Sequence, residues 1–275
     1  PACQYNKKFI QLPQIKDKLF ISELKSQCLK NKISVIIPTI DTGLKKLSKA
    51  KKEFKKHNID IIISDLALIE KSTHKAKKKF LFNEIGLDYP KIYNASKEIK
   101  YPCFAKPFDG SASKNNFKIE NSKELNSIRR KHKNLVYMEY VDIKKFDEYT
   151  IDLYYDKNYI LKSLIARKRI EVRSVEVSKS ITNKKLSNLL WNNFKNLKNA
   201  IGTITGQVFI NNKNGMIIGI EINPRFGGGY PLSHIAKANF IRNIISEYLK
   251  NKSIKKNMLW KDNLLMLRYD AEIIC

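Results

Sequence analysis

Two segments of the chain combine residue types that bind phosphate and metal ions. In the first, CFAKPFDGSASKNN (residues 103–116), a strand-like run delivers Lys106, and the loop after Pro107 consists mainly of small residues. Phosphate oxygens bind well to one fixed cation together with several backbone N–H groups, which residues such as Ser111 and Ser113 leave unobstructed. The segment therefore predicts a phosphate-binding loop. An ordinary turn that carries a surface lysine is the alternative.

The second segment, IEINPRFGGGY (residues 220–230), places a carboxylate, an amide and a cation before three glycines. Glu221 and Asn223 lie two residues apart, so in a strand their side chains project from the same face. Magnesium prefers such oxygen ligands, and Gln207 on the preceding predicted strand offers another. Arg225 suits a phosphate, and the glycines allow close approach to a ligand. The alternative is a structural Glu221–Arg225 pair followed by a flexible turn.

Two strand-like segments add weaker signals. In Val136–Asp142 the backbone around Met138–Val141 is suited to bracketing a flat base, and nearby carboxylates such as that of Glu148 accept hydrogen bonds from ribose hydroxyls. An exposed strand flanked by acidic residues is the alternative interpretation of this segment.

Three of the eight arginines, Arg167, Arg169 and Arg173, alternate within RKRIEVRSVEVSK (residues 167–179). Their concentration in a lysine-rich chain indicates a fixed geometry for an acidic substrate or an acyl phosphate. An exposed basic edge strand, which protects a sheet against aggregation, explains the pattern equally well.

The elements that must position these residues begin with a parallel α/β unit. Ile33–Pro38 and Ile59–Ser64 are short apolar runs without alternation, as in strands buried on both faces of a parallel sheet. Leu44–His57 between them reads as an amphipathic helix, which completes a strand–helix–strand unit. A second helix is predicted over residues 66–85 and ends at Gly86.

From residue 101 onward the pattern changes to short strands with intervening helices. In residues 149–155, Ile151 and Leu153 face one way while Thr150 and Asp152 face the other, as in a half-buried antiparallel strand. The predicted strands cover residues 103–106, 117–119, 135–140, 148–155, 159–169, 206–211 and 216–223, and the predicted helices cover residues 122–132, 184–200 and 232–249. The pattern predicts a small parallel α/β domain followed by a larger α+β domain, with a boundary near residues 86–100.

Composition excludes several classes of protein. The formal net charge is +27, but it arises from 45 lysines and only 8 arginines, alongside 37 isoleucines and 26 asparagines. A bias toward A/T-rich codons explains this excess, and nucleic-acid-binding proteins usually keep arginine for forked contacts. The most apolar region, residues 59–69, is broken by Asp60 and Asp65 and is too short to span a membrane. The four cysteines (3, 28, 103 and 275) show no metal-ligand spacing and indicate reduced thiols in a cytoplasm.

Taken together, the motifs resemble the ATP-grasp superfamily. The order KPFDGSASK, MEYVD with EYTID, RKRIEVR, QVFI and EINPRFGGGYPLSHIA is most similar to the carbamoyl-phosphate-synthase-like branch of stand-alone ligases. The upstream runs VIIPTIDTGL and STHKAKKKFLFNEIGLDYPKIY resemble the pre-grasp domain of that branch and the helix that enters the grasp. The resemblance covers essentially the whole chain.

The resemblance implies an α/β plus α+β architecture, the ATP-grasp fold with a truncated N-terminal parallel α/β (pre-grasp) domain. Residues 1–90 would form that domain and its linker, whose first strand the family plan places before Pro1. Residues 91–275 would form the ATP-grasp domain, divided into a small ATP-binding lobe (91–142) and a large metal and substrate lobe (143–275).

The resemblance also implies roles for individual residues. ATP phosphates would contact Lys75 and Lys106 beneath a flap that includes Ser111, Ser113 and Lys114. The adenine hinge would hold Glu139 and Val141, with Glu148 on the ribose. The ligands of Mg²⁺ (or Mn²⁺) would be Gln207, Glu221 and Asn223, and Arg225 would clamp the transferring phosphate, with Lys106 and Asn223 as the other catalytic residues.

These roles imply an ATP- and Mg²⁺-dependent ligase that forms a carbon–nitrogen bond. Such an enzyme activates a small carboxylate as an acyl phosphate, which an amine or ammonia then attacks. We expect small carboxylate and amine substrates, a cytoplasmic location, no membrane and no nucleic-acid partner, with a homodimer as one option for assembly. Two alternatives stay open: a basic nucleic-acid-binding protein, and an ATP-binding remnant without catalysis.

Overall fold

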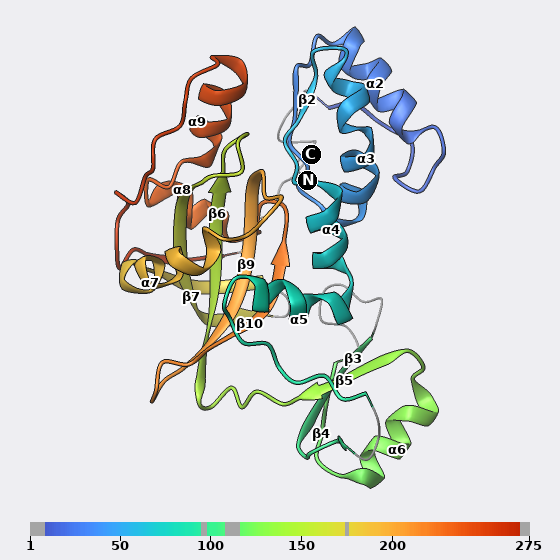
Figure 1. Ribbon diagram of the computed structural model, residues 1–275, viewed down its shortest axis with the longest axis vertical. Coiled ribbons are helices and arrows are strands. Elements are labelled where there is room, and N and C mark those ends of the chain that lie inside the picture. The colour runs from blue at the N-terminus through green and yellow to red at the C-terminus, as the bar shows by residue number, and fades with distance from the viewer. Residues whose placement is uncertain (1–8, 95–97, 108–115, 174–175, 270–275) are drawn as a thin grey trace.

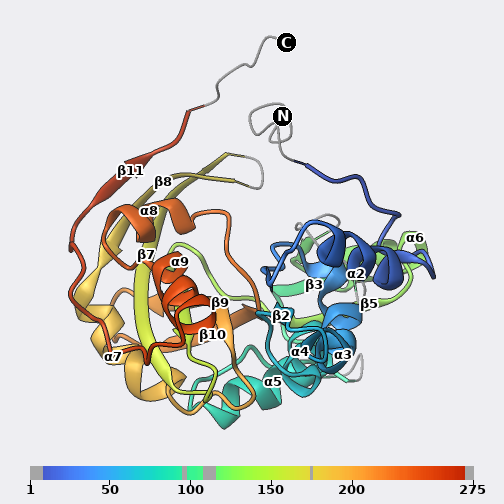
Figure 2. The same cartoon turned by 90° about the horizontal axis from the view of Figure 1, so that it is seen from above.

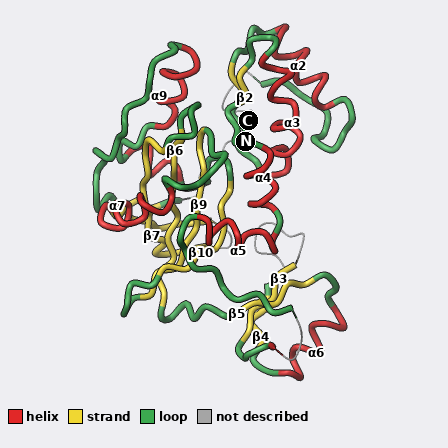
Figure 3. The backbone as a smooth tube through the Cα atoms, in the orientation of Figure 1, coloured by secondary structure: helices red, strands yellow, loops and turns green. Residues whose placement is uncertain are grey.

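Three separate sheets make up the architecture of the computed structural model (Figures 1 and 3). The structure describes residues 9–94, 98–107, 116–173 and 176–269, and it describes only the backbone at residues 75, 76, 173 and 176–178. A six-stranded sheet lies on one side of the molecule. The N-terminal unit and a three-stranded sheet both lie on the other side, as the view from above also shows (Figure 2).

The N-terminal unit contains the predicted strand–helix–strand arrangement. Strand β1 (Val35–Ile36) pairs in parallel with β2 (Asp60–Ile61), and helix α3 (Leu44–Lys55) connects them. Helix α2 (Phe20–Lys30), which the sequence did not predict, packs beside α3 around a core that includes Phe20, Leu44 and Phe54. The prediction of a parallel α/β unit is confirmed.

The predicted helix over residues 66–85 is wrong in one respect, because two helices occupy this stretch. Helix α4 (Leu66–Thr73) ends where His74 adopts an extended backbone, and α5 (Lys75–Glu84) begins directly after it. The Ser72 and Thr73 hydroxyls both donate to the Ile69 carbonyl, at 3.0 and 2.8 Å. Such local bonds compete with the backbone bonds that would continue a helix.

The small sheet has the order β4–β3–β5, and all of its pairs are antiparallel. Its strands are β3 (Cys103–Pro107), β4 (Phe117–Ile119) and β5 (Leu135–Glu139), and helix α6 (Ser122–Lys131) covers the core beneath them. Asn121 caps α6 by accepting from the Glu124 backbone N–H at 3.0 Å. The Glu124 carboxylate in turn accepts from the Glu120 N–H at 2.8 Å, a reciprocal cap of the kind that begins many helices.

The six-stranded sheet has the order β10–β9–β6–β7–β8–β11 and is antiparallel throughout. Its strands are β6 (Phe146–Tyr155), β7 (Leu161–Arg173), β8 (Glu176–Asn183), β9 (Gly202–Asn211), β10 (Ile217–Asn223) and β11 (Leu265–Leu267). The segment 167–179 therefore folds back as β7 and β8. Because Arg167 is buried on β7 between β6 and β8, the interpretation as an exposed basic edge strand is wrong for that residue, whereas residues 170–172 are exposed.

The two faces of this sheet differ sharply in character. One face carries Ile151, Leu153, Leu164 and Val208, which pack with helix α7 (Lys184–Phe194) into the largest core cluster. The other face is polar. Directly opposed residues of neighbouring strands share a face, and their register gives three rows across it. The first row consists of the pairs Phe209–Glu148 and Arg169–Ser180, which a side-chain contact between Glu148 and Arg169 joins. The second row is Glu221–Gln207–Thr150–Arg167–Thr182, and the third is Asn223–Thr205–Asp152–Ile165.

The C-terminal segment corrects the predicted helix over residues 232–249. The structure has α8 (Tyr230–Ile235), α9 (Phe240–Ile244) and a π-helical turn over Ile245–Leu249. Between α8 and α9, Lys237 takes the left-handed backbone conformation (φ 82°), and the Asn239 side chain then caps α9. These elements cover one end of the polar face. Among the described residues, no helix has the length and apolar character needed to span a membrane.

The division of the chain at residues 90 and 142 stays a prediction. The predicted alternation within residues 149–155 is confirmed, because Ile151 and Leu153 join the largest core while Thr150 and Asp152 lie on the opposite face. The prediction that this strand is half-buried is wrong, since residues 149–155 are buried on both faces.

Candidate active site

A cavity of about 130 Å³ lies where the small sheet meets the β9–β10 end of the large sheet. The small sheet contributes Lys106 from β3 and the stretch around Glu139 and Val141 after β5, and the large sheet contributes Phe209 and Ile220. The remaining lining residues are largely apolar or aromatic: Tyr89, Pro90, Phe104, Met138, Tyr140, Ile143 and Gly219. An apolar cavity with a few polar groups at its rim suits a flat heterocycle.

An extra residue in β10 connects this cavity to the polar face. The β9–β10 register shifts between Gly219 and Glu221, so Ile220 is a β-bulge residue. A bulge re-aims the side chains on either side of it. Ile220 lines the cavity, while its neighbour Glu221 lies directly opposite Gln207 in the second row. The three predicted metal ligands, Gln207, Glu221 and Asn223, are therefore neighbours on two adjacent strands beside the cavity.

The donor set of these three residues fits a divalent cation. Asn223 Nδ2 donates to Glu221 Oε1 at 2.8 Å, which shows that the two side chains meet. Rotation of the amide by half a turn would present its oxygen beside the carboxylate, since amide orientation follows the hydrogen-bond partners that are present. One carboxylate and two amide oxygens, completed by phosphate oxygens, form a typical Mg²⁺ ligand set.

A buried lysine that sequence reasoning missed faces the same carboxylate. Lys78 on α5 is only 8% exposed, and its Nζ lies 3.9 Å from Glu221 Oε2. Burial lowers the pKa of Lys78, and the carboxylates of Glu221 and Asp41 oppose that shift. The sequence did contain a signal that Lys78 is buried. Lys78 shares the helical spacing i, i+3, i+4, i+7 with the buried residues 81, 82 and 85, so it lies on the same face of the helix.

Arg225 is held from the N-terminal unit. Its Nε and Nη2 donate to the two carboxylate oxygens of Asp41 at 2.7 and 2.6 Å, and its Nη1 donates to the Phe226 carbonyl at 2.8 Å. The alternative of a structural Glu221–Arg225 pair is therefore wrong. The phosphate-clamping role of Arg225 stays a prediction, and it requires the guanidinium to exchange at least part of its contact with Asp41.

Glu148 and Arg169 form a pair in the first row. Arg169 Nη1 on β7 donates to Glu148 Oε1 on β6, next to the opposed pair Tyr149–Lys168. Burial raises the pKa of the Glu148 carboxyl, nearby Arg169 opposes this, and the negative charge of Glu221 adds to it. The structure thus brings Glu148 and Glu221 into the same electrostatic neighbourhood, although the ribose contact of Glu148 stays a prediction.

The remaining predicted residues fall into three groups. Arg167 is buried in the second row and pairs with Asp152. Lys75 begins α5 and Arg173 ends β7, and only their backbones are described. The flap residues Ser111, Ser113 and Lys114 lie outside the described residues.

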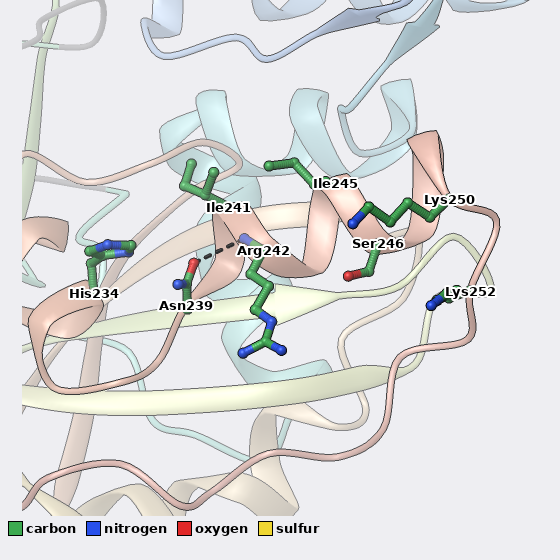
Figure 4. A pocket seen from close by; sticks show the side chains of 8 residues that line it. All are labelled: His234, Asn239, Ile241, Arg242, Ile245, Ser246, Lys250 and Lys252. Atoms are coloured by element: carbon green, nitrogen blue, oxygen red, sulfur yellow. Dashed lines mark hydrogen bonds between the residues drawn. The ribbon is translucent and has the colours of Figure 1, made fainter.

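A second hollow, of about 450 Å³, lies along α9 and the π-helical turn, with side chains from the segment 234–252 around it (Figure 4). It is lined by His234, Asn239, Ile241, Arg242, Ile245, Ser246, Lys250 and Lys252. The contact between Asn239 Oδ1 and the Arg242 backbone N–H, 2.9 Å, is the cap of α9. No carboxylate lines this hollow, so it offers no ligand set comparable to that around Glu221.

Two family models match the sequence of this chain. A model of the ATP-grasp domain family matches residues 74–229, more than half of the chain, and a model of the PylC-like N-terminal domain matches residues 1–62. No curated protein sequence matches the chain.

Solved structures share the fold at low sequence identity. The biotin carboxylase domain of Hydrogenobacter thermophilus 2-oxoglutarate carboxylase, in complex with MgADP, ADP and bicarbonate, has a TM-score of 0.72 at 16% identity, over 94% of this chain and 62% of that one. An L-amino acid ligase from Bacillus licheniformis has a TM-score of 0.66 at 17% identity, over 88% and 62%. N5-carboxyaminoimidazole synthetase from Staphylococcus aureus, complexed with ADP, has a TM-score of 0.66 at 19% identity, over 86% and 64%. The chain thus spans about three fifths of the length of these structures.

Proposed function

We propose, from the premise that this chain belongs to the ATP-grasp family, that it is an ATP- and Mg²⁺-dependent ligase. It would transfer a phosphoryl group from ATP to a small carboxylate, and an amine or ammonia would then displace that phosphate to form a carbon–nitrogen bond. The carbamoyl-phosphate-synthase-like subtype is part of this proposal.

One observation carries the proposal. The cavity that Lys106, Glu139 and Val141 line reaches Ile220, whose immediate neighbour Glu221 meets Asn223 and lies opposite Gln207. A nucleotide base in that cavity would therefore have its phosphates beside an acid, two amides and the buried ammonium of Lys78. Phosphoryl transfer depends mainly on positioning and charge neutralisation, which such a constellation can supply.

Each residue has a defined part in this proposal. Lys106 would neutralise phosphate charge from the small sheet, and the groups around Glu139 and Val141 would hold the base. Glu148 would accept from the ribose, with Arg169 keeping its carboxylate in place. Arg225 would stabilise the transferring phosphate, with Asp41 orienting its guanidinium. Lys75 and the loop with Ser111, Ser113 and Lys114 complete the proposed phosphate contacts.

Gln207, Glu221 and Asn223 would hold Mg²⁺, which when bound neutralises phosphate charge and polarises the reacting oxygens. Glu221 is suited to this role because its contact with Lys78 is long, 3.9 Å, whereas the carboxylates of Asp41 and Glu148 are held by close arginine contacts. The ADP bound in two structurally similar proteins, and the magnesium bound in one of them, support the same choice of cosubstrate and metal.

The experiment is ADP release by the full chain with ATP and Mg²⁺, across a panel of amino acids, dipeptides and bicarbonate, each with candidate amines. We expect turnover that requires both a carboxylate and an amine. The Glu221→Ala variant should lose at least about a hundredfold in kcat, because it removes the only charged ligand of the proposed metal set.

A matched control is Glu53→Ala, which removes an exposed carboxylate paired with Lys25 on the N-terminal unit. Its turnover should equal that of the wild type, and circular dichroism should show that both variants keep the fold. Undiminished turnover by Glu221→Ala would contradict the metal assignment. ATP binding without ADP release on any substrate would favour the remnant, and oligonucleotide binding that weakens steeply with salt would favour the nucleic-acid-binding alternative.

A further inference from the structure

Arg167 is a buried cation whose hydrogen-bonding capacity is only partly used. It lies on β7 in the middle of the large sheet and is 1% exposed. Its Nε donates to Asp152 Oδ2 at 2.8 Å, but within the described part of the chain neither Nη1 nor Nη2 has a hydrogen-bond partner. The guanidinium thus leaves unused the two-nitrogen edge that matches a carboxylate in fork geometry.

The partner of Arg167 is also incompletely bonded. Ser233 Oγ donates to Asp152 Oδ2 at 2.5 Å, while Asp152 Oδ1 has no partner among the residues that the structure describes. A structural ion pair in a protein interior is favourable only if its remaining donors and acceptors are satisfied. The Asp152–Arg167 pair does not meet that condition, so stability alone does not account for it.

The glycine segment Gly227–Gly229 covers this pair. A Cβ placed on Gly229 would lie 2.3 Å from Arg167 Nη1, and one on Gly227 would lie 2.8 Å from Thr205 Oγ1 and 3.4 Å from Asp152 Oδ1. A Cβ on Gly228 would meet nothing within 4 Å. The segment therefore crosses the polar face from β9 over β6 to β7, and its backbone rests on the guanidinium where any side chain would collide.

The location relates this guanidinium to the proposed reaction. Arg167 and Glu221 belong to the same row, three strands apart, which corresponds to about 14 Å between their backbone positions. The carboxylate that is phosphorylated must reach the ATP phosphates beside Glu221. An anion bound at Arg167 would therefore be a different group of the same substrate.

We propose that Arg167 is the receptor for a second carboxylate of the substrate, which binds to its Nη1 and Nη2 beneath the segment Gly227–Gly229. This inference rests on the proposed function in taking the ligand to be a substrate, and it names the substrate class: a compound with one carboxylate to activate and another to hold. Asp152 keeps the guanidinium oriented through Nε and leaves Nη1 and Nη2, which the glycine segment covers, for the ligand.

The test measures anion binding to the full chain without ATP or metal, by nuclear magnetic resonance of the arginine side-chain nitrogens. The Arg167 signal is identified by its loss in Arg167→Lys. The probes are sodium acetate, inorganic phosphate and sodium chloride at equal ionic strength. We expect a saturable shift of the Arg167 signal with acetate, a weaker one with phosphate and none with chloride.

Two glycine variants form a matched pair. Gly229→Ala pushes a methyl group against the guanidinium and should weaken acetate binding at least about tenfold, the loss that corresponds to one charge-assisted hydrogen bond. Gly228→Ala, whose methyl group meets nothing, should bind acetate as the wild type does. This pair keeps the test decisive if the Arg167→Lys variant does not fold.

Three results would overturn the proposal: no saturable shift with any anion, tighter binding of phosphate than of acetate, or equal binding by the two glycine variants. The readout requires no turnover, so it is independent of the proposed ligase activity. Acetate binding together with no ADP release would keep the Arg167 site and refute the ligase, whereas the reverse would keep the ligase and refute this site.

Discussion

The two faces of the six-stranded sheet are built from the same strands, but they differ in how fully their side chains are packed and hydrogen-bonded. On the apolar face, Ile151, Leu164 and Phe194 are fully buried in one continuous core. On the polar face lie six of the seven buried side-chain atoms that lack a hydrogen-bond partner in the described part of the chain; these belong to Asp152, Ser163, Arg167, Arg169 and Ser180.

This difference separates the apolar face, which stabilises the fold, from the polar face, whose unpaired groups can bind a ligand. Buried polar atoms are nearly always bonded in native proteins, so a cluster of exceptions on one surface needs an explanation. Tight packing on one face can stabilise the sheet without help from the other. The polar face is thereby left with donors and acceptors for water or a ligand, at a location next to the candidate metal residues.

The largest expected effect is on the apolar face. Phe194→Ala removes a fully buried ring that lies against Gly206 and should lower the free energy of unfolding by about 3–5 kcal/mol. Urea unfolding of the variant and of Phe80→Ala, whose ring is 64% exposed, measures the difference. A loss of less than about 1 kcal/mol for Phe194→Ala would show that the apolar face is not the main source of stability.

A pair of buried serines compares the two faces directly. Ser187 on α7 donates to the Asn183 carbonyl at 2.7 Å and accepts from the Ala166 N–H at 2.8 Å, whereas Ser163 on the polar face has no partner. Ser187→Ala should therefore cost about 1–3 kcal/mol, because it leaves the Ala166 N–H unpaired, while Ser163→Ala should change stability by about zero. Equal losses in urea midpoints would abolish the distinction between the faces.

The smallest expected effect on stability concerns the ion pair between Arg225, which follows β10, and Asp41 of the N-terminal unit. A double-mutant cycle of Asp41→Asn and Arg225→Met should give a coupling energy of about 0.5–1 kcal/mol in thermal or urea unfolding, since the pair is bidentate but partly exposed. The more exposed Lys45–Glu70 pair serves as the control and should couple less. A coupling no larger than that of the control would show that Asp41 does not fix Arg225.

The sequence predicted elements well where pattern and structure share one cause. The alternation in residues 149–155 arises because one face packs into the apolar core while the other, although also buried, carries the polar rows. The parallel unit at Val35–Ile36 and Asp60–Ile61 follows for the same reason. The helix over residues 66–85 was wrong because side-chain hydroxyls at 72 and 73 compete with the backbone, an effect that hydrophobic periodicity does not record.

The candidate site was predicted for residues that share a local motif, and missed for residues that meet only in space. Glu221 and Asn223 are two residues apart, so strand geometry alone brings them together. Asp41 lies 184 positions before Arg225, and nothing in its neighbourhood of small residues indicates that partner. Lys78 lies among other lysines in the sequence, so its charge does not distinguish it. Only its position on the buried face of helix α5 does.

The bulge at Ile220 has a structural consequence for how much one strand can do. In a regular strand, successive side chains point to opposite faces of the sheet. Such a strand can therefore contribute side chains to two sites only in strict alternation. By inserting one residue after Gly219, β10 turns a hydrophobic side chain toward the small sheet without giving up the carboxylate that follows. An insertion or deletion of a single residue here would turn Glu221 toward the cavity beside the small sheet and Ile220 toward the polar face. Every other strand of the sheet would stay in register.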